Sequence, residues 1–155
     1  LQVMLTNSQN LYAECVLKRL GEGSFESGGE AVLRALADLG VATEGLQVRD
    51  GSGLARSNRL TARSLYQTLQ SMRDQPVFVE ALAAGGEGTL RRRYRDLKER
   101  VRAKTGTIRG VSTFSGYVTG RDGGRYVFAI LANGSAVSRA RAFQDLVVQA
   151  LARAP

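Results

Sequence analysis

The residues best suited to chemistry lie in two short motifs, Ser8-Gln9-Asn10 and Lys104-Thr105-Gly106. A lysine ammonium group can stabilise an anion or move a proton, and the hydroxyl group of the threonine beside it can donate a hydrogen bond to a carboxylate. A serine hydroxyl can relay a proton, and an asparagine amide can hold a carbonyl group or a lysine. Together the two motifs predict a site for proton transfer beside a bound carboxylate.

The second motif belongs to a β-rich run that begins at Val101, so its side chains should alternate between the two faces of a strand. Lys104 and Gly106 then share one face, and Thr105 and Thr107 share the other. Because glycine has no side chain, Gly106 would let a ligand lie along the strand and pair with its backbone.

Each motif alone also has a purely structural explanation. Ser8 or Asn10 could cap the helix that follows, with Glu14 favourably placed in its first turn. Lys104 could be a solvated lysine beside a turn glycine. Either motif by itself is therefore a weak indication of function.

The chain contains no histidine and a single cysteine, Cys15. Within these residues a Ser-His-Asp triad, a histidine-ligated metal and an internal disulfide are all excluded. No metal or cofactor is expected. Cys15 has helical spacing with neighbouring apolar residues, which favours a small core residue.

The formal net charge of +8 is concentrated in residues 91–104, RRRYRDLKERVRAK, which hold eight basic and two acidic residues. Such a run can bind phosphates, but a solvated face is the favoured interpretation because Tyr94 is the only aromatic residue in it. A nucleic-acid-binding domain is thus the weakest hypothesis, and no nucleic-acid partner is expected.

The length of 155 residues and a hydrophobic content of 43% are typical of one globular domain or a large part of one. The longest apolar runs, such as Tyr126–Ala132, are too short to span a membrane, and no leader sequence opens the chain. Since the chain begins LQVML without an initiator methionine, we expect it to be part of a longer protein.

Hydrophobic spacing predicts helices in the first two thirds of the chain. The first helix is expected at about Leu11–Leu20, and the second follows a Ser27–Glu30 capping box and runs to Leu39. A third helix is expected to begin after Thr61 as its cap. Two shorter helices are expected at Pro76–Ala83 and Thr89–Leu97. Gly21 and Gly40 are placed to end the first two helices. A short strand near Leu46–Arg49 should lead into the turn-rich segment Asp50–Asn58.

The pattern then changes to that of a sheet. Strands are predicted at Val101–Ile108, Val111–Thr119 and Arg125–Ala132, with a hairpin turn at Arg121–Gly124. A last helix is predicted over Val137–Ala152, and the side chains expected to face inward from it are Phe143, Leu146, Val147, Ala150 and Leu151. Helices followed by an antiparallel sheet with a terminal helix packed on it predict an α+β fold.

The order of the motifs carries a family resemblance. Serine acyl-transferases that work without histidine use Ser-x-x-Lys, Ser-x-Asn and Lys-Thr-Gly, and this sequence has the second and third in that order. From Leu5 to Gly134 it resembles the class C low-molecular-mass penicillin-binding proteins, which are D-alanyl-D-alanine carboxypeptidases and endopeptidases. The segments that carry the resemblance are SQNLYAE (8–14), DGSGLARSNRLT (50–61), GEGTLRRR (86–93) and RAKTGTIRGVSTFSGY (102–117).

The resemblance implies part of a penicillin-binding-protein/serine β-lactamase-like transpeptidase fold. It also implies that Ser8 relays a proton to the leaving amine, that Asn10 positions the substrate amide and that Lys104 supplies a positive field for the substrate's terminal carboxylate. The Thr105–Thr107 stretch would bind that carboxylate, and the backbone N–H of Thr107 would form half of an oxyanion hole.

No Ser-x-x-Lys occurs in the 155 residues, so the serine that would be acylated is not among them. Cys15-Val-Leu-Lys18 has the same spacing, but it lies inside the helix after Ser8-x-Asn10 and is interpreted as a coincidence. Residues 1–155 are therefore expected to be the C-terminal portion of a penicillin-binding (D,D-peptidase) domain, without hydrolase activity of its own.

The resemblance further implies peptidoglycan peptides and β-lactams as ligands, and a location outside the cytoplasmic membrane. A non-catalytic module that binds cell-wall peptides is the alternative. Since the sheet of this family uses strands from both ends of the full domain, the chain is also expected to expose a sheet edge and to self-associate through it.

Overall fold

The computed structural model describes residues 1–134 and 136–155. The chain divides into two compact units, a sheet unit of residues 1–8 and 72–155 and a helical unit of residues 9–71. Within the described residues, no helix is both long and apolar enough to cross a membrane.

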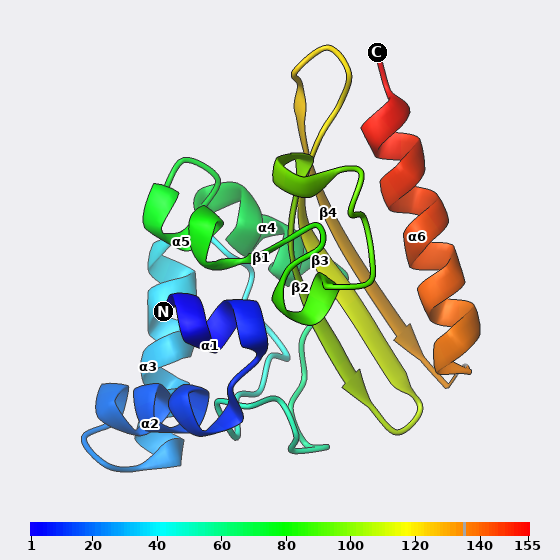
Figure 1. The fold of residues 1–155 in the computed structure, drawn as a ribbon. Helices are drawn as coiled ribbons and strands as arrows, with labels where there is room; N and C mark the ends of the chain where they lie inside the picture. Colours follow the sequence, from blue (N-terminus) through cyan, green and yellow to red (C-terminus); the bar gives the residue numbers. More distant parts are fainter. Residues whose placement is uncertain (135) are drawn as a thin grey trace. The chain divides into compact units, whose positions relative to one another are not determined.

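The sheet unit contains an antiparallel sheet with the strand order β1-β2-β3-β4 (Figure 1). The strands are β1 (Ala83–Ala84), β2 (Val101–Ile108), β3 (Val111–Thr119) and β4 (Arg125–Asn133). The three predicted strands are confirmed, and β4 continues one residue beyond its predicted end. β1 was not predicted, because a pairing of two alanines with Ala103 and Arg102 is too short to leave a sequence pattern.

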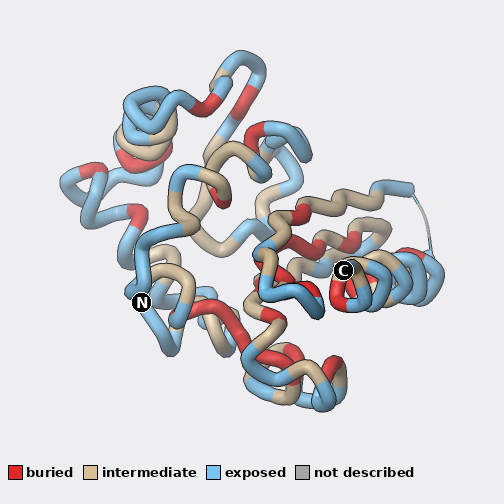
Figure 2. The backbone as a smooth tube through the Cα atoms, turned by 90° about the horizontal axis from the view of Figure 1, so that it is seen from above, coloured by how far each residue is buried: buried red, intermediate tan, exposed pale blue. Residues whose placement is uncertain are grey.

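Helix α6 (Val137–Arg153) packs along the sheet, and buried positions follow the strands and one side of α6 (Figure 2). At the centre of this core the Phe114 ring stacks on Tyr94, with ring centroids 5.9 Å apart, and meets Phe128 at 5.1 Å. Aromatic pairs of this kind contribute about 1 kcal/mol each beyond the area they bury. The aromatic cluster therefore helps to fix the sheet against the segment that precedes β2.

The predicted inner face of α6 is wrong except at Leu151, which is partly buried and packs against the core. The buried residues of the helix are Ala140, Gln144, Val148 and Ala152. Phe143 and Leu146, which were expected to face inward, are 57% and 67% exposed. The buried residues are four positions apart and form one ridge of the helix, with alanine at both ends allowing close approach to the sheet. Hydrophobic periodicity identified an apolar side of α6 but not the side that contacts the sheet.

The segment before β2 is not the helix predicted for Thr89–Leu97. It forms two short 3₁₀ turns, η1 (Gly88–Leu90) and η2 (Lys98–Arg100), with Tyr94 between them at φ +53°. A tyrosine in the left-handed region interrupts any regular helix. Leu90 and Tyr94 are both buried, so packing of these two side chains determines the path of the segment.

Two more helices complete the sheet unit, α1 (Gln2–Asn7) and α5 (Pro76–Ala81). The second confirms the helix predicted from Pro76, which ends two residues earlier than expected. The first was not predicted. It is anchored by a hydrogen bond from Thr6 Oγ1 to the carbonyl oxygen of Ala81, 2.8 Å long.

The helical unit contains α2 (Asn10–Leu20), α3 (Phe25–Asp38) and α4 (Ala62–Ser71), which confirms the three helices predicted there. The capping box expected at Ser27 is wrong, because α3 is capped by Ser24, whose Oγ accepts the N–H groups of Glu26 and Ser27. Gly28 and Gly29 lie inside α3 and are buried. A Cβ on Gly28 would lie 2.2 Å from the carbonyl oxygen of Leu17, so this glycine is needed for α3 to approach α2.

Helix α2 also turns its apolar side outward. Leu17 is its one buried residue, whereas Leu11 is 68% exposed and Leu20 is 54% exposed. Cys15 is exposed as well, so its interpretation as a core residue is wrong. The N-cap expected from Ser8 or Asn10 is also wrong, because Gln9 holds that position and makes no side-chain cap.

The turn-rich segment after residue 49 is organised around one carboxylate. Asp50 accepts hydrogen bonds from the N–H groups of Gly53 and Ala55 and from the side chains of Ser52 and Asn58. Burial alone would raise the pKa of Asp50, but these hydrogen bonds outweigh it and lower the pKa. The strand expected at Leu46–Arg49 is reduced to a single bridge between residues 47 and 59.

Candidate active site

Ser8 and Lys104 meet in the sheet unit although 96 positions separate them. The Nζ atom of Lys104 donates hydrogen bonds to Ser8 Oγ, 2.7 Å away, and to the carbonyl oxygen of Thr105, 2.6 Å away. The serine of the first motif and the lysine of the second therefore form a direct contact. This arrangement allows a proton to pass between an ammonium group and a hydroxyl group.

The position of Ser8 follows from the end of α1. Ser8 is the C-terminal cap of this helix, with φ 56° and ψ 53°, and its N–H group donates to the carbonyl oxygen of Met4. A left-handed conformation costs a non-glycine residue roughly 1 kcal/mol. Gly88 lies close to the same helix and has no room for a side chain, since a Cβ there would lie 2.2 Å from the carbonyl oxygen of Thr6. The chain thus accepts local strain where the hydroxyl group of Ser8 reaches Lys104.

The Lys104 side chain is partly buried. Burial lowers its pKa from the ordinary lysine value of 10.5, because removing an ammonium group from water disfavours the charged form. A lowered pKa increases the neutral fraction at a given pH. Lys104 is accordingly better suited to exchanging a proton with Ser8 than an exposed lysine would be.

Thr105 and Thr107 lie on the other face of β2, as the alternation predicts, and line a pocket of about 420 Å³. Helix α6 contributes Arg141 and Gln144 to the same pocket. An N–H group of Arg141 donates to Thr107 Oγ1 at 3.3 Å, and the buried Gln144 amide donates to Ser112 Oγ at 3.1 Å. The threonine face of β2 is therefore lined by hydroxyl groups and by a permanent cation.

Gly106 has a second reason to lack a side chain. In the sheet it pairs with Thr113, and a Cβ on Gly106 would lie 2.3 Å from Thr113 Oγ1. On the opposite side of β2, strand β1 pairs with residues 102 and 103 alone. From Lys104 onward, this edge of β2 has no strand partner among the described residues, which leaves it free to pair with an extended ligand.

Asn10 is the first residue of α2 and is exposed. It belongs to the helical unit, whereas Ser8 and Lys104 belong to the sheet unit. Glu14 does not act at the helix start, because its carboxylate accepts the N–H groups of Gly51 and Ser52. In the helical unit Glu14 therefore ties α2 to the turn around Asp50.

A second network joins the segment before β2 to α6. Asp145 accepts hydrogen bonds from Arg93, at 2.7 and 3.0 Å, and from the phenol of Tyr94. The Arg93 guanidinium group also lies 4.5 Å from the centre of the Phe114 ring. Burial and the hydrogen bond to Asp145 raise the pKa of Tyr94, so its phenol stays protonated at neutral pH.

Sequence reasoning missed Arg141, Arg93 and Gln144 as pocket residues. Arg141 is exposed and 34 positions away from Thr107, so no local pattern connects the two. Arg93 was seen only as part of a basic run. The one available signal was the segment GEGTLRRR, which ends at Arg93 and already carried part of the family resemblance.

Comparison with known proteins decides the family. The profile of the D-Ala-D-Ala carboxypeptidase 3 (S13) family matches residues 1–154. The chain belongs to this family. The resemblance predicted from the motifs of the sequence is therefore confirmed.

Relatives within the S13 family are much longer than this chain. A D-alanyl-D-alanine carboxypeptidase of Actinomadura sp. (strain R39) is 37% identical over 94% of the chain, which corresponds to 30% of the relative. The carboxypeptidase DacB of Mycolicibacterium smegmatis is 36% identical over 86% of the chain and 33% of its own length. The chain thus spans about a third of the length of these curated relatives.

Solved structures confirm the predicted fold. Penicillin binding protein 4 (dacB) from Haemophilus influenzae has a TM-score of 0.88 at 24% identity, over 99% of this chain and 39% of that protein. The same protein in complex with a β-lactam gives a TM-score of 0.85 at 23% identity, over 99% of this chain and 41% of that protein. At this identity the likeness establishes the α+β fold of this S13 chain.

Proposed function

We propose that this S13 chain is part of a serine D,D-carboxypeptidase/endopeptidase that cleaves D-Ala-containing peptidoglycan peptides through an acyl-enzyme. The observation that carries the proposal is the 2.7 Å contact between Lys104 Nζ and Ser8 Oγ. The names of the relatives support the carboxypeptidase activity. Ser8, Asn10 and Lys104 are its catalytic residues in this chain.

The chain's own residues would serve the two proton transfers of the reaction. Ser8 Oγ passes a proton to the amine that leaves as the peptide bond breaks, and Lys104 Nζ supplies or recovers that proton. The amide of Asn10 holds the substrate amide in position. The hydroxyl groups of Thr105 and Thr107 bind the terminal carboxylate, and the absence of a side chain at Gly106 lets the peptide lie along the backbone of β2.

The acylated serine is outside these 155 residues, because no Ser-x-x-Lys occurs in them. A fluorescent penicillin should therefore not label the chain covalently. Denaturing electrophoresis after incubation measures this directly, and a stable fluorescent band would contradict the proposal that the nucleophile is missing.

Peptide binding tests the part of the proposal that concerns this chain. N-acetyl-D-Ala-D-Ala should bind saturably in calorimetry, without release of D-alanine. Lys104→Ala should weaken the binding about tenfold, since it removes the hydrogen bonds that hold Ser8 Oγ and the Thr105 carbonyl group at the site. Lys98→Ala, at an exposed lysine, is the matched control. Equal affinities of the two variants would argue against a role for Lys104.

The alternative is a non-catalytic module that binds cell-wall peptides, and the missing Ser-x-x-Lys favours it. An assay on a polypeptide as long as the curated relatives distinguishes the enzyme from the binding module. Release of D-alanine from the peptide supports the enzyme, and binding without release supports the module. Binding of duplex DNA in a gel-shift assay would instead support the weaker hypothesis of a nucleic-acid-binding domain.

The parent protein would act outside the cytoplasmic membrane, where peptidoglycan is found.

Self-association is a further part of this proposal. β4 is the last strand of the sheet and pairs with β3 alone among the described strands, so its other edge is open to a second copy. Light scattering should show a mass that rises with protein concentration, and a constant monomer mass would contradict self-association.

A further inference from the structure

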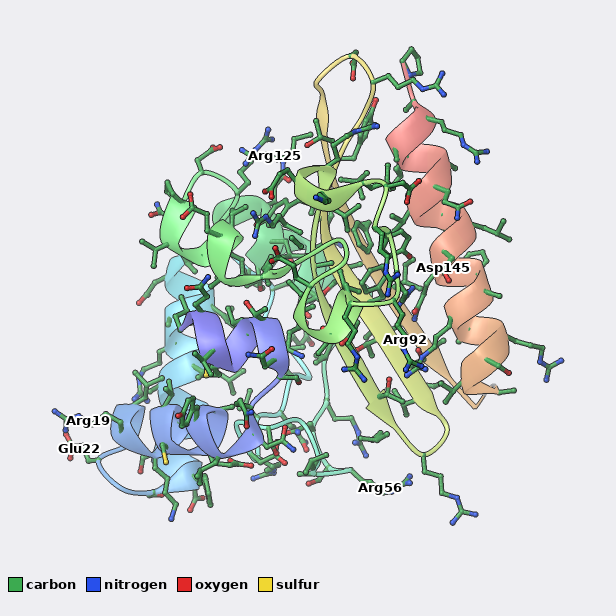
Figure 3. All side chains as sticks on the ribbon, viewed as in Figure 1. Arg19, Glu22, Arg56, Arg92, Arg125 and Asp145 are labelled. Carbon is green, nitrogen blue, oxygen red and sulfur yellow. The ribbon has the colours of Figure 1, made fainter. Side chains whose placement is uncertain are left out.

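The pocket on the threonine face of β2 carries more positive charge than its own contacts neutralise. Its lining residues include Arg91, Arg92, Arg93 and Arg141, and Asp145 is the acidic residue among them. Figure 3 labels Arg92 and Asp145 in the region between the segment before β2 and α6. Because Asp145 is paired with Arg93, the other three guanidinium groups have no carboxylate partner within the described residues.

Hydroxyl groups accompany these guanidinium groups. The Thr89 Oγ1 atom is buried in the pocket lining and has no hydrogen-bond partner among the described residues. Thr107 Oγ1 is contacted by Arg141. Unpaired cations beside a hydroxyl group without a partner are the features of a site for an oxyanion.

Lys104 is poorly placed to supply the positive charge for that anion. Its Nζ atom already donates to Ser8 Oγ and to the carbonyl oxygen of Thr105. Its side chain also leaves β2 on the face opposite to Thr107. A carboxylate held by the Thr107 hydroxyl group would therefore meet a guanidinium group of the pocket before it met the lysine ammonium group.

We propose that Arg141 is a specificity-determining residue, which binds the terminal carboxylate of the peptide substrate together with Thr107. This inference rests on the proposed function and reassigns the carboxylate charge from Lys104 to Arg141. The guanidinium group is planar and permanently charged, and it can shift from one hydroxyl contact to two parallel hydrogen bonds with a carboxylate. Lys104 then holds Ser8 and the Thr105 carbonyl group through its hydrogen bonds and serves proton transfer. Arg91 and Arg92 add a weaker, salt-screened attraction.

The test compares N-acetyl-D-Ala-D-Ala with its C-terminal amide, which lacks the negative charge. The chain should bind the acid more tightly than the amide in calorimetry. Arg141→Gln should weaken binding of the acid about tenfold and leave binding of the amide unchanged, because only the acid offers a charged partner. Arg141→Lys should recover part of the loss. Arg139→Gln removes the same charge from an exposed position of α6 and should change neither affinity.

An acid-to-amide preference that persists in Arg141→Gln would overturn the proposal, and so would an equal loss in Arg139→Gln. Absence of binding of both peptides would count against the proposed function instead. In that case the Nε–H resonance of Arg141 is followed by NMR during titration with N-acetyl-D-alanine. A saturable shift that is absent with N-acetyl-D-alanine amide supports the Arg141 pocket, and no shift overturns it.

Discussion

The two faces of β2 carry different kinds of positive charge. On one face Lys104 is partly buried, contacts Ser8 and has a lowered pKa. On the other face Arg141 contacts the exposed hydroxyl group of Thr107. A guanidinium group stays charged at any physiological pH, whereas a buried ammonium group can lose its proton. One strand thus separates a group suited to proton transfer from groups suited to holding an anion.

The largest expected effect comes from disturbing the packing of β3 against β2, the strand that carries both faces. A Cβ on Gly116 would lie 2.2 Å from the carbonyl oxygen of Arg102 and 2.6 Å from Ala103 Cα. Gly116→Val should lower the free energy of unfolding by about 3 kcal/mol or more, measured by urea denaturation. The control Gly123→Ala meets open space at φ +85° and should cost only about 1 kcal/mol. Equal costs would show that the overlap with β2 is unimportant.

Loss of the Asp145 carboxylate should disturb the threonine face and spare the lysine face. Asp145→Ala leaves Arg93 and the Tyr94 phenol without their partner, so stability should fall by about 2 kcal/mol. The pKa of Lys104, followed by NMR, should not change. Asp96→Ala, at an exposed carboxylate, should cost less than about 0.5 kcal/mol. A shift in the pKa of Lys104 would mean that the two faces are coupled.

A smaller effect is expected from one hydroxyl group. Thr107→Val keeps the shape of an exposed side chain but removes the contact of Arg141. Binding of N-acetyl-D-Ala-D-Ala should weaken about fivefold, corresponding to one hydrogen bond, while stability stays the same. Thr119→Val at the far end of β3 should leave the affinity unchanged. An unaltered affinity in Thr107→Val would remove this threonine from the proposed carboxylate site.

The smallest effect should come from the titration of Lys104. Its pKa is lowered in the folded chain, so between that value and 10.5 the unfolded chain binds more protons and stability rises with pH. Lys104→Met cannot titrate. The free energy of unfolding of the wild type, minus that of the variant, should therefore increase as the pH approaches 10.5. Urea denaturation at several alkaline pH values measures this difference, and a decrease with pH would contradict burial as the cause.

Apolar helix faces mark one limit of the sequence. Phe143 and Leu146 have helical spacing, yet both side chains are exposed, as is the apolar side of α2. Periodicity reports that a helix has an apolar side, but the contact depends on which ridge fits the opposing surface. In α6 this ridge includes Gln144, which is buried because its amide bonds to Ser112. Because a polar residue lies at the centre of the buried ridge, hydrophobic periodicity does not identify that ridge from the sequence.

The sequence by itself determined the three long strands, the hairpin and the separation of Lys104 from Thr107 on opposite faces of β2, because alternation is a local property of the backbone. The order of its motifs also indicated the family. Only the tertiary structure decided that Ser8 reaches Lys104 and that Arg141 reaches Thr107. Contacts across 96 and 34 positions depend on how α1 and α6 pack, and packing is settled by the fit of whole surfaces rather than by the residues at the contact.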